Sequence, residues 1–192
     1  MTELVKRGIA KRESATSLLF DSLLPGESFL SVNYDNPKEY IKKYWTAIEK
    51  ANRPLLFKYI IYTLLYREGI RPFYTMATIV DVPPVKIDAF LYNQSAPVSL
   101  SLKTSLRERY KQADLEAIAL KYVHRRSKCY LLTMDSKEAK AQKGKILSGD
   151  IIGLDEIIDC NTDDIDNLIA NLKQTSFEMS EKIEVVQGNL VK

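Results

Sequence analysis

Two carboxylates and a lysine in the middle of this sequence have the types and the spacing of a cation-binding site. They are Asp88, Lys103 and Glu116, with Ser101 two residues before the lysine. Two carboxylates held about 4 Å apart repel each other by roughly 4 kcal/mol at an effective dielectric constant of about 20, so a bound cation would be needed to stabilise them. Mg²⁺ and Mn²⁺ prefer oxygen ligands. These residues therefore indicate a site for a hard divalent cation.

The segments that would position these side chains are expected to form a β-hairpin. Residues 85–92 and 97–104 each alternate apolar and polar side chains, and the residues between them are of turn-forming types. A turn at the midpoint would pair Asp88 with Ser101, because paired residues in an antiparallel hairpin have a constant index sum. Lys103 lies two residues after Ser101 and shares its face. All three side chains are therefore expected on one polar face of the hairpin.

A helix expected over residues 106–124 would bring in the second carboxylate. Arg109, Gln112 and Glu116 are spaced so that they project from one side of this helix. Because the helix begins just after the hairpin and must fold back on the sheet, Glu116 can approach Asp88. The alternative is a hairpin whose polar face is exposed, with Glu116 paired to a neighbouring lysine or arginine.

The remaining pattern predicts an α/β protein with a mixed central sheet flanked by helices and a largely helical N-terminal part. We expect a single domain over residues 1–192, with a helical part at 1–70, a core at 71–160 and a C-terminal helix and tail at 161–192. Periodicity and capping residues predict helices over residues 3–24, 37–51, 55–67, 136–145 and 163–174. Strands or extended pieces are expected at 29–34, at 129–134 and near 151–152, and the tail beyond Glu181 is expected to be loose.

The composition excludes several classes of protein. The chain has 192 residues, of which 45% are hydrophobic and 28% charged, enough apolar material for one core. Two cysteines and one histidine are too few for a disulfide framework, a zinc cluster or a two-histidine metal site. The sequence has no apolar run of about 18 residues, and charged residues near the N-terminus argue against a signal peptide. We expect a cytoplasmic protein that makes no membrane contact.

Charge is distributed unevenly along the chain. Residues 1–134 contain 21 Lys and Arg against 13 Asp and Glu, a net charge of +8, and residues 135–192 contain 7 against 12, a net charge of −5. This separation indicates a basic working surface whose partner would be a polyanion such as nucleic acid. The alternative is that most of these lysines lie on solvated helix faces.

The spacing of the candidate residues resembles the PD-(D/E)xK nuclease core. Twelve residues separate Asp88 from the Ser-Leu-Lys triplet that ends at Lys103, and twelve more precede Glu116. This is similar to the restriction endonucleases whose second acidic residue lies on the helix after the strand, which leaves Ser-x-Lys in place of the usual motif. The run KTSLRERYKQ that begins at Lys103 looks like the corresponding segment of those enzymes. The resemblance covers about residues 85–135 and implies a restriction-endonuclease-like core.

The resemblance implies a role for each member of the motif. Asp88 and Glu116 would hold Mg²⁺ together with the backbone carbonyl of Leu102, and Mn²⁺ would substitute for it. Lys103 would orient the attacking water and stabilise the charge that develops on the phosphate. Ser101 belongs to the same catalytic set. The reaction would be hydrolysis of phosphodiester bonds in DNA.

Further residues have roles by the same resemblance. Arg109 and Gln112 would contact DNA phosphates, Arg109 through its planar guanidinium group. The helix over residues 37–51 fits the helix that precedes the core in the family. Glu49, late on that helix, would be an acid that orients a water on the metal or Lys103. Its alternative is an ordinary surface glutamate.

The first carboxylate of the motif has a competitor. The proline–aspartate pair of the family is degenerate here, since Pro84 stands four residues before Asp88 and Asp81 lies nearby. We prefer Asp88 because its hairpin register places it opposite Ser101, whereas the register of Asp81 does not.

The chain as a whole looks like the small subunit of heterodimeric type IIS restriction endonucleases. In those enzymes a large subunit recognises an asymmetric DNA site and nicks one strand, and the small subunit cuts the other. The sequence has no evident helix-turn-helix or zinc finger with which to read DNA. The resemblance therefore implies double-stranded DNA and a larger DNA-recognising subunit as partners. A self-sufficient homodimeric restriction or repair and branch nuclease, and a non-catalytic DNA- or protein-interaction domain with a decayed nuclease core, remain as alternatives.

Overall fold

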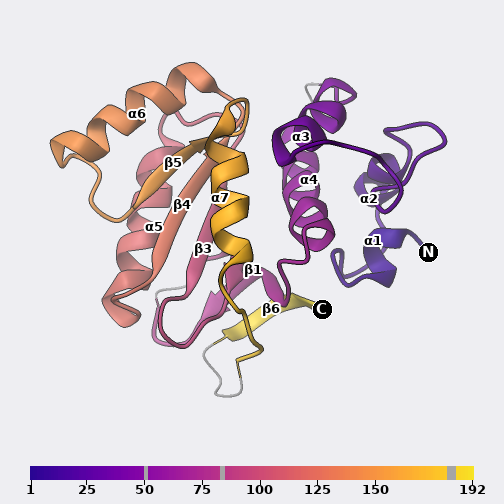
Figure 1. Cartoon of the computed structure of the whole chain (residues 1–192). Coiled ribbons are helices and arrows are strands. Elements are labelled where there is room, and N and C mark those ends of the chain that lie inside the picture. Colours follow the sequence, from indigo (N-terminus) through magenta and orange to yellow (C-terminus); the bar gives the residue numbers. More distant parts are fainter. Residues whose placement is uncertain (50–51, 83–84, 181–184) are drawn as a thin grey trace.

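A six-stranded mixed β-sheet covered by helices on both faces forms the centre of the protein (Figure 1). This computed structural model describes residues 1–49, 52–82, 85–180 and 185–192. The strands follow the order β5-β4-β3-β2-β1-β6 across the sheet. Their bounds are β1 Phe73–Ile79, β2 Ile87–Leu91, β3 Val98–Leu102, β4 Lys128–Thr133, β5 Glu156–Asp159 and β6 Val185–Val191. The expected α/β class with a mixed central sheet is confirmed.

The two halves of the sheet differ in strand direction. Strands β6, β1, β2 and β3 pair antiparallel, whereas β3, β4 and β5 run parallel. The apolar strand expected at 129–134 is β4, and it pairs with β3 inside the sheet. In the hairpin of β2 and β3, Ala89 pairs with Leu100. The same index sum sets Asp88 opposite Ser101, which confirms the predicted register.

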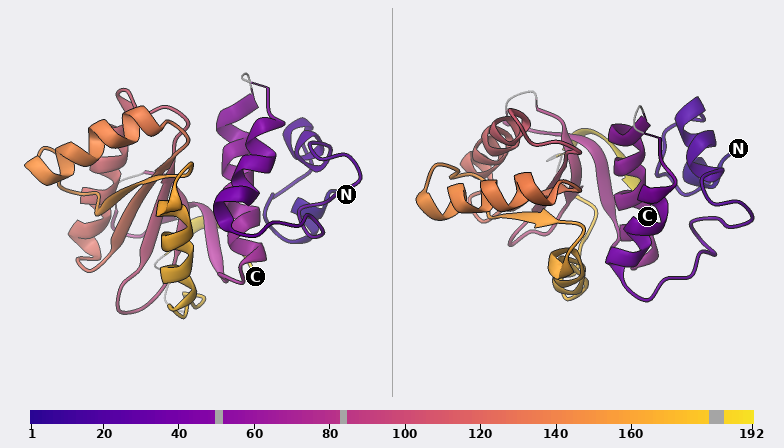
Figure 2. Two further views of the ribbon diagram at one scale, coloured as in Figure 1. Left: turned by 45° about the horizontal axis from the view of Figure 1, so that its top comes forward. Right: turned by 90° about the horizontal axis from the view of Figure 1, so that it is seen from above.

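The helices form two layers, one on each face of the sheet (Figures 1 and 2). Helices α5 and α6 share an apolar cluster with Phe90 and Leu131 of the sheet, and α3, α4 and α7 share another with Leu100 and Leu132. The adjacent residues Leu131 and Leu132 of β4 thus face opposite layers, as the two-residue period of a strand requires. The bounds of the helices are α1 Glu3–Lys6, α2 Ala15–Asp21, α3 Pro37–Thr46, α4 Arg53–Arg67, α5 Arg109–Val123, α6 Ser136–Ser148 and α7 Asp163–Lys173.

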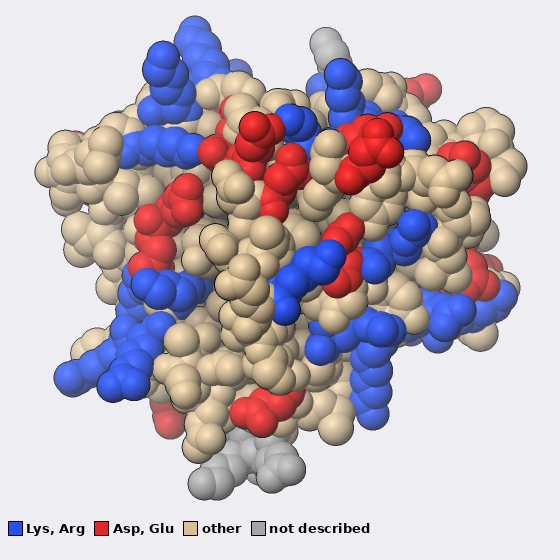
Figure 3. All heavy atoms as spheres, viewed as in Figure 1, with Lys and Arg blue, Asp and Glu red and all other residues tan. Residues whose placement is uncertain are grey.

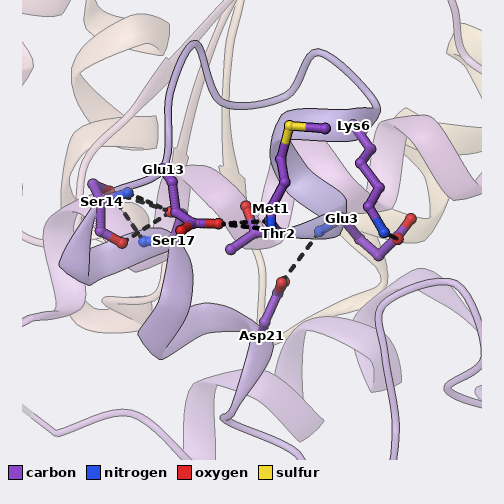
Figure 4. Close-up of polar contacts among 8 residues, drawn as sticks. All are labelled: Met1, Thr2, Glu3, Lys6, Glu13, Ser14, Ser17 and Asp21. Atoms are coloured by element: carbon purple, nitrogen blue, oxygen red, sulfur yellow. Dashed lines mark hydrogen bonds and ion pairs between the residues drawn. The ribbon is translucent and has the colours of Figure 1, made fainter.

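The single helix expected over residues 3–24 is wrong, because two short helices occupy this segment. Gly8 follows α1 with φ +73°, a left-handed conformation that favours glycine and ends the helix. Ser14 then caps α2 through a capping box. The Glu13 carboxylate accepts a hydrogen bond from the backbone N–H of Thr2 at 2.9 Å, which ties the two helices together (Figure 4).

The strand predictions failed at the edges of the sheet. Residues 29–34 contain turns and form no strand. Strands β1 and β6 were not predicted, and β6 lies in the tail that was expected to be loose, although residues 181–184 are outside the described part. The strand expected near 151–152 lies instead at β5, since the loop before it is held against α5 by Asp114.

The N-terminal part is fastened to the end of α4. The guanidinium group of Arg67 donates hydrogen bonds to the carbonyl oxygens of Phe29 at 2.6 Å and Val32 at 3.1 Å. These bonds satisfy carbonyl groups of a segment that has no strand partner. None of the described helices is long and apolar enough to cross a membrane.

Charged side chains are interspersed on the face that carries α7 (Figure 3). The acidic first turn of α7 forms ion pairs with lysines of other helices: Asp163 with Lys38 of α3, and Asp164 with Lys143 of α6 at 2.5 Å. The negative charge of the C-terminal third is therefore partly neutralised by its neighbours.

Candidate active site

Asp88 lies at the centre of the polar face of the hairpin. Its side chain is on β2 and the residue is only 2% exposed. Oδ2 accepts a hydrogen bond from the backbone N–H of Leu102 at 2.8 Å and lies 3.1 Å from Nζ of Lys103. The register explains both contacts, because Ser101 stands opposite Asp88 and the next two residues pass beside its carboxylate. The predicted aspartate and lysine are therefore in direct contact.

Helix α5 brings Glu116 to the same face. Oε1 accepts a hydrogen bond from the amide of Gln112 at 2.8 Å, and Oε2 lies 3.4 Å from the hydroxyl of Ser101, which donates to it. Burial is the main cause that raises the pKa of Glu116 above its usual value. The ammonium of Lys103 and the hydrogen bonds oppose this rise, and the nearby carboxylate of Asp88 adds to it. Glu116 is therefore a carboxylate whose charge is poorly compensated.

Lys58 of α4 is the residue that sequence reasoning missed. Its Nζ lies 2.6 Å from Oδ1 of Asp88, and its side chain is 20% exposed. One turn later, the hydroxyl of Tyr62 donates to the backbone carbonyl of Asp88 at 2.7 Å. A signal was present, because Lys58 is the one charged residue between Arg53 and Arg67 in an otherwise apolar and aromatic helix. A lysine inside such a helix needs a partner.

A cleft of about 730 Å³ opens beside these side chains. Two carboxylates and three lysines line it: Asp88 and Glu116, with Lys58, Lys103 and the exposed Lys86. Because Asp88 and Glu116 are buried and Glu116 pairs with Gln112 and Ser101, the alternative of an exposed polar hairpin with a locally paired Glu116 is wrong. The cleft lets a ligand reach a site whose ionic groups are otherwise shielded from water.

Contacts on the outer side of α5 hold Glu116 in position. Asp114 accepts hydrogen bonds from the backbone N–H groups of Gly153 at 2.6 Å and Leu154 at 3.1 Å. The loop approaches so closely that a Cβ on Gly153 would lie 2.4 Å from the carbonyl oxygen of Asp114. Before the helix, the carboxylate of Glu138 accepts a hydrogen bond from the N–H of Leu106. The helix therefore meets the sheet in a defined register.

Two predicted phosphate contacts have different surroundings. Arg109 is exposed at the start of α5, and the described residues that line the cleft include Gln112 but not Arg109. Gln112 is exposed too, yet its amide donates to Glu116. Of the three residues expected on one side of α5, Gln112 and Glu116 therefore line the cleft, whereas the described lining does not include Arg109.

Two further candidates lie away from this cluster. The helix expected over residues 37–51 ends at Thr46, so the placement of Glu49 late on a helix is wrong, and Glu49 lies in an exposed loop. The helix that directly precedes the hairpin and contacts it is α4. Asp81 lies in an exposed turn after β1 with φ +61°, whereas Pro84 is outside the described residues.

The donor atoms of the cluster suit a hard divalent cation. In the described part of the chain there is no group of three or more carboxylate, histidine or cysteine side chains that could hold a metal. Asp88 and Glu116 line one cleft, however, and Leu102 contacts Asp88 through its backbone N–H group. Mg²⁺ keeps several water ligands and commonly takes only one or two carboxylates from the protein. The two carboxylates of the cleft therefore fit this ion.

Comparison with known proteins gives a likeness of fold. No family model and no curated protein matches the sequence. The structure is similar to that of the restriction endonuclease PspGI in complex with substrate DNA, with a TM-score of 0.52 and 16% sequence identity. The match covers 94% of this chain and 83% of that chain. At this identity the likeness concerns the arrangement of the elements, and the chain has a restriction-endonuclease-like fold.

Proposed function

We propose that this chain is a Mg²⁺-dependent endodeoxyribonuclease that hydrolyses phosphodiester bonds of double-stranded DNA. The observation that carries the proposal is that Asp88, Lys103 and Glu116 line one cleft, on a fold similar to that of a restriction endonuclease. Three chemically unlike side chains from two strands and one helix meet there. The solved structure with the similar fold is a complex with its substrate DNA.

The metal would be held by Asp88, Glu116 and the carbonyl of Leu102, and Mn²⁺ would substitute for Mg²⁺. When bound, such an ion polarises the scissile phosphate and lowers the pKa of a water. The raised pKa of Glu116 supports this assignment, because a nearby cation would relieve the cost of its buried charge.

The remaining roles in the reaction would belong to side chains of the protein. Lys103 is held at 3.1 Å by Asp88, so its ammonium is in place to orient the attacking water and to stabilise the charge that develops on the phosphate. Ser101 positions Glu116 by its hydrogen bond, and so does Gln112. The exposed guanidinium of Arg109 is free to contact a phosphate of the DNA backbone outside the cleft.

We further propose that the chain is the strand-cleaving small subunit of a type IIS restriction enzyme, and that it acts with a larger DNA-recognising subunit. Helix α5 supports a partner of this kind. It exposes Leu115 (66%) and Tyr122 (86%), large hydrophobic side chains two turns apart, with Ala119 between them, and this row begins at the cleft, which Leu115 and Ala119 also line. Exposed apolar side chains that lie together on one helix are typical of an interaction surface.

The test is plasmid cleavage with the chain and the product of the gene that adjoins its own, in Mg²⁺. We expect linear DNA from the pair and intact DNA from the chain alone. Lys103→Ala should reduce cutting of the second strand by about 10²-fold or more, so that nicked circles accumulate. Lys42→Ala, an exposed lysine on α3, is the matched control and should leave linear DNA as the product.

Each alternative predicts another result. Unchanged double-strand cutting by Lys103→Ala would remove the assignment of the site. Cleavage by the isolated chain would favour a self-sufficient homodimeric restriction or repair and branch nuclease with the same core. A chain that neither cleaves nor binds Mn²⁺ would be a non-catalytic interaction domain with a decayed core.

A further inference from the structure

Lys58 occupies the place beside Asp88 that a cation would take. Its Nζ lies 2.6 Å from Oδ1 of Asp88, while Oδ2 already accepts from Leu102 and pairs with Lys103. A carboxylate has about four lone-pair positions, and three donors are directed at this one. Little of Asp88 is therefore left for a metal while Lys58 stays in place.

The charges of the cleft lead to the same conclusion. The carboxylates of Asp88 and Glu116 face the ammonium groups of Lys58 and Lys103, and the exposed Lys86 adds a third positive charge, so the lining carries a net charge of +1 when both acids are ionised. A divalent cation that enters this cluster meets two positive charges at short range. Repulsion between charges in a partly buried site is only weakly screened by salt. A metal ion and Lys58 therefore compete for one carboxylate.

Lys58 has space in which to move. It also lines a second cavity of about 320 Å³ that adjoins the first, and its Nζ lies 3.5 Å from the sulfur of Met76 between the two. The described lining of this second cavity includes Lys11 and Lys86 but no carboxylate. Rotation of the flexible lysine stem can transfer its ammonium from Asp88 to this cavity without movement of α4.

We propose that Lys58 is a built-in counter-ion that competes with the divalent cation for Asp88, so that metal loading requires Lys58 to leave. This inference rests on the proposed function, since it takes Asp88 as a metal ligand. It gives a physical reason why the isolated chain would be inactive, because the site holds its own cation in the absence of DNA and partner. Lys58 thereby opposes metal binding at Asp88, whereas Lys103 takes part in the reaction.

The test measures Mn²⁺ binding to the isolated full chain by calorimetry. Lys58→Met keeps the length of the side chain and removes its charge, and we expect Mn²⁺ to bind about tenfold more tightly or better than to the wild type. Lys58→Gln is a second neutral variant that retains a hydrogen-bond donor, and it should gain affinity in the same direction. Lys86→Met is the matched control: it removes a lysine that lines the same cleft but is exposed, and should change the affinity less than about threefold.

Asp88→Asn in the Lys58→Met chain should abolish the gain, which locates the ion. If wild type and Lys58→Met bind Mn²⁺ equally well, the competition is refuted and the metal site stands. An equal gain in Mn²⁺ affinity in Lys86→Met refutes the competition too, because the overall charge of the cleft, and not the contact between Lys58 and Asp88, would then control the affinity. If neither folded Lys58 variant binds Mn²⁺ at millimolar concentration, the metal site fails, and the proposed function with it.

Discussion

The two carboxylates of the site should have opposite effects on stability in the absence of metal. Asp88 forms ion pairs with two lysines and accepts the N–H of Leu102, so Asp88→Asn leaves two ammonium groups of low exposure without the carboxylate that contacts them. Removal of one partner from a fully buried ion pair costs about 3–5 kcal/mol. Because the two lysine side chains are 20% and 12% exposed and can regain some water at the cleft, we expect about 2–3 kcal/mol.

Glu116→Gln should act in the other direction at neutral pH. The pKa of Glu116 in the folded protein lies above its unfolded value of 4.5, mainly because of burial. The folded state therefore binds its proton more tightly, and the stability that this gives is complete below pH 4.5 and lost as the pH rises through the raised folded pKa. A glutamine has no such loss. The variant should be more stable than wild type at pH 7, by a margin that shrinks as the pH falls toward 4.5.

Thermal and urea unfolding followed by circular dichroism in EDTA would measure both effects. For a chain of this size, 2–3 kcal/mol corresponds to a fall in Tm of about 5–10 °C for Asp88→Asn. Asp81→Asn is the matched control, because Asp81 is exposed and asparagine tolerates its left-handed backbone, so its effect should stay within about 0.5 kcal/mol. The reasoning is refuted if Asp88→Asn stabilises the protein as Glu116→Gln does. Repulsion between the carboxylates would then dominate, and the two lysines would not be their counter-ions.

Two further predictions concern packing. Gly153→Ala should lower the free energy of unfolding by about 2–4 kcal/mol in urea titrations, because its Cβ would lie 2.4 Å from the backbone of Asp114. Gly144→Ala is the matched control: this glycine faces open space within α6, and its replacement should raise the free energy of unfolding by up to about 1 kcal/mol. Equal effects of the two changes would contradict the close approach. Burial raises the pKa of the Cys129 thiol to about 11 and that of Cys160 still further, so both should react with Ellman's reagent at pH 8 only after unfolding in guanidinium. Rapid labelling of the native chain would show that this core opens.

The parts of the fold that were predicted correctly depend on contacts between neighbours in the chain. The hairpin of β2 and β3 has a short turn, so its register follows from the residue numbers and sets Asp88 opposite Ser101. Helix α5 begins soon after β3, and little chain is available for it to lie anywhere but against that hairpin. Three of the five charged groups that line the cleft therefore come from one segment, residues 88–116.

The missed strands illustrate the opposite case. β6 contributes an edge strand whose partner β1 lies more than 100 residues earlier, and Gly188 brings it close enough that a Cβ there would be 3.3 Å from Ala77. No pattern within either strand predicts a pairing between two segments so far apart in the sequence. β1 carried little signal of its own, because its buried positions include the polar Thr75 and its exposed positions include the apolar Met76, so polarity does not alternate along the strand.

Local and distant contacts also contribute differently to the site. Local contacts bring the proposed reactive groups together, whereas a distant contact occupies the carboxylate of Asp88. Asp88, Lys103 and Glu116 are assembled by one hairpin and one helix, so any chain that folds this segment acquires the reactive groups. Lys58 comes from α4, in the opposite helical layer, and its contact with Asp88 forms only when that layer packs on the sheet. A shift of α4 by a partner or by DNA would move both Lys58 and Tyr62 relative to Asp88. The helical layer can therefore act on the site through Asp88, the residue that both side chains of α4 contact.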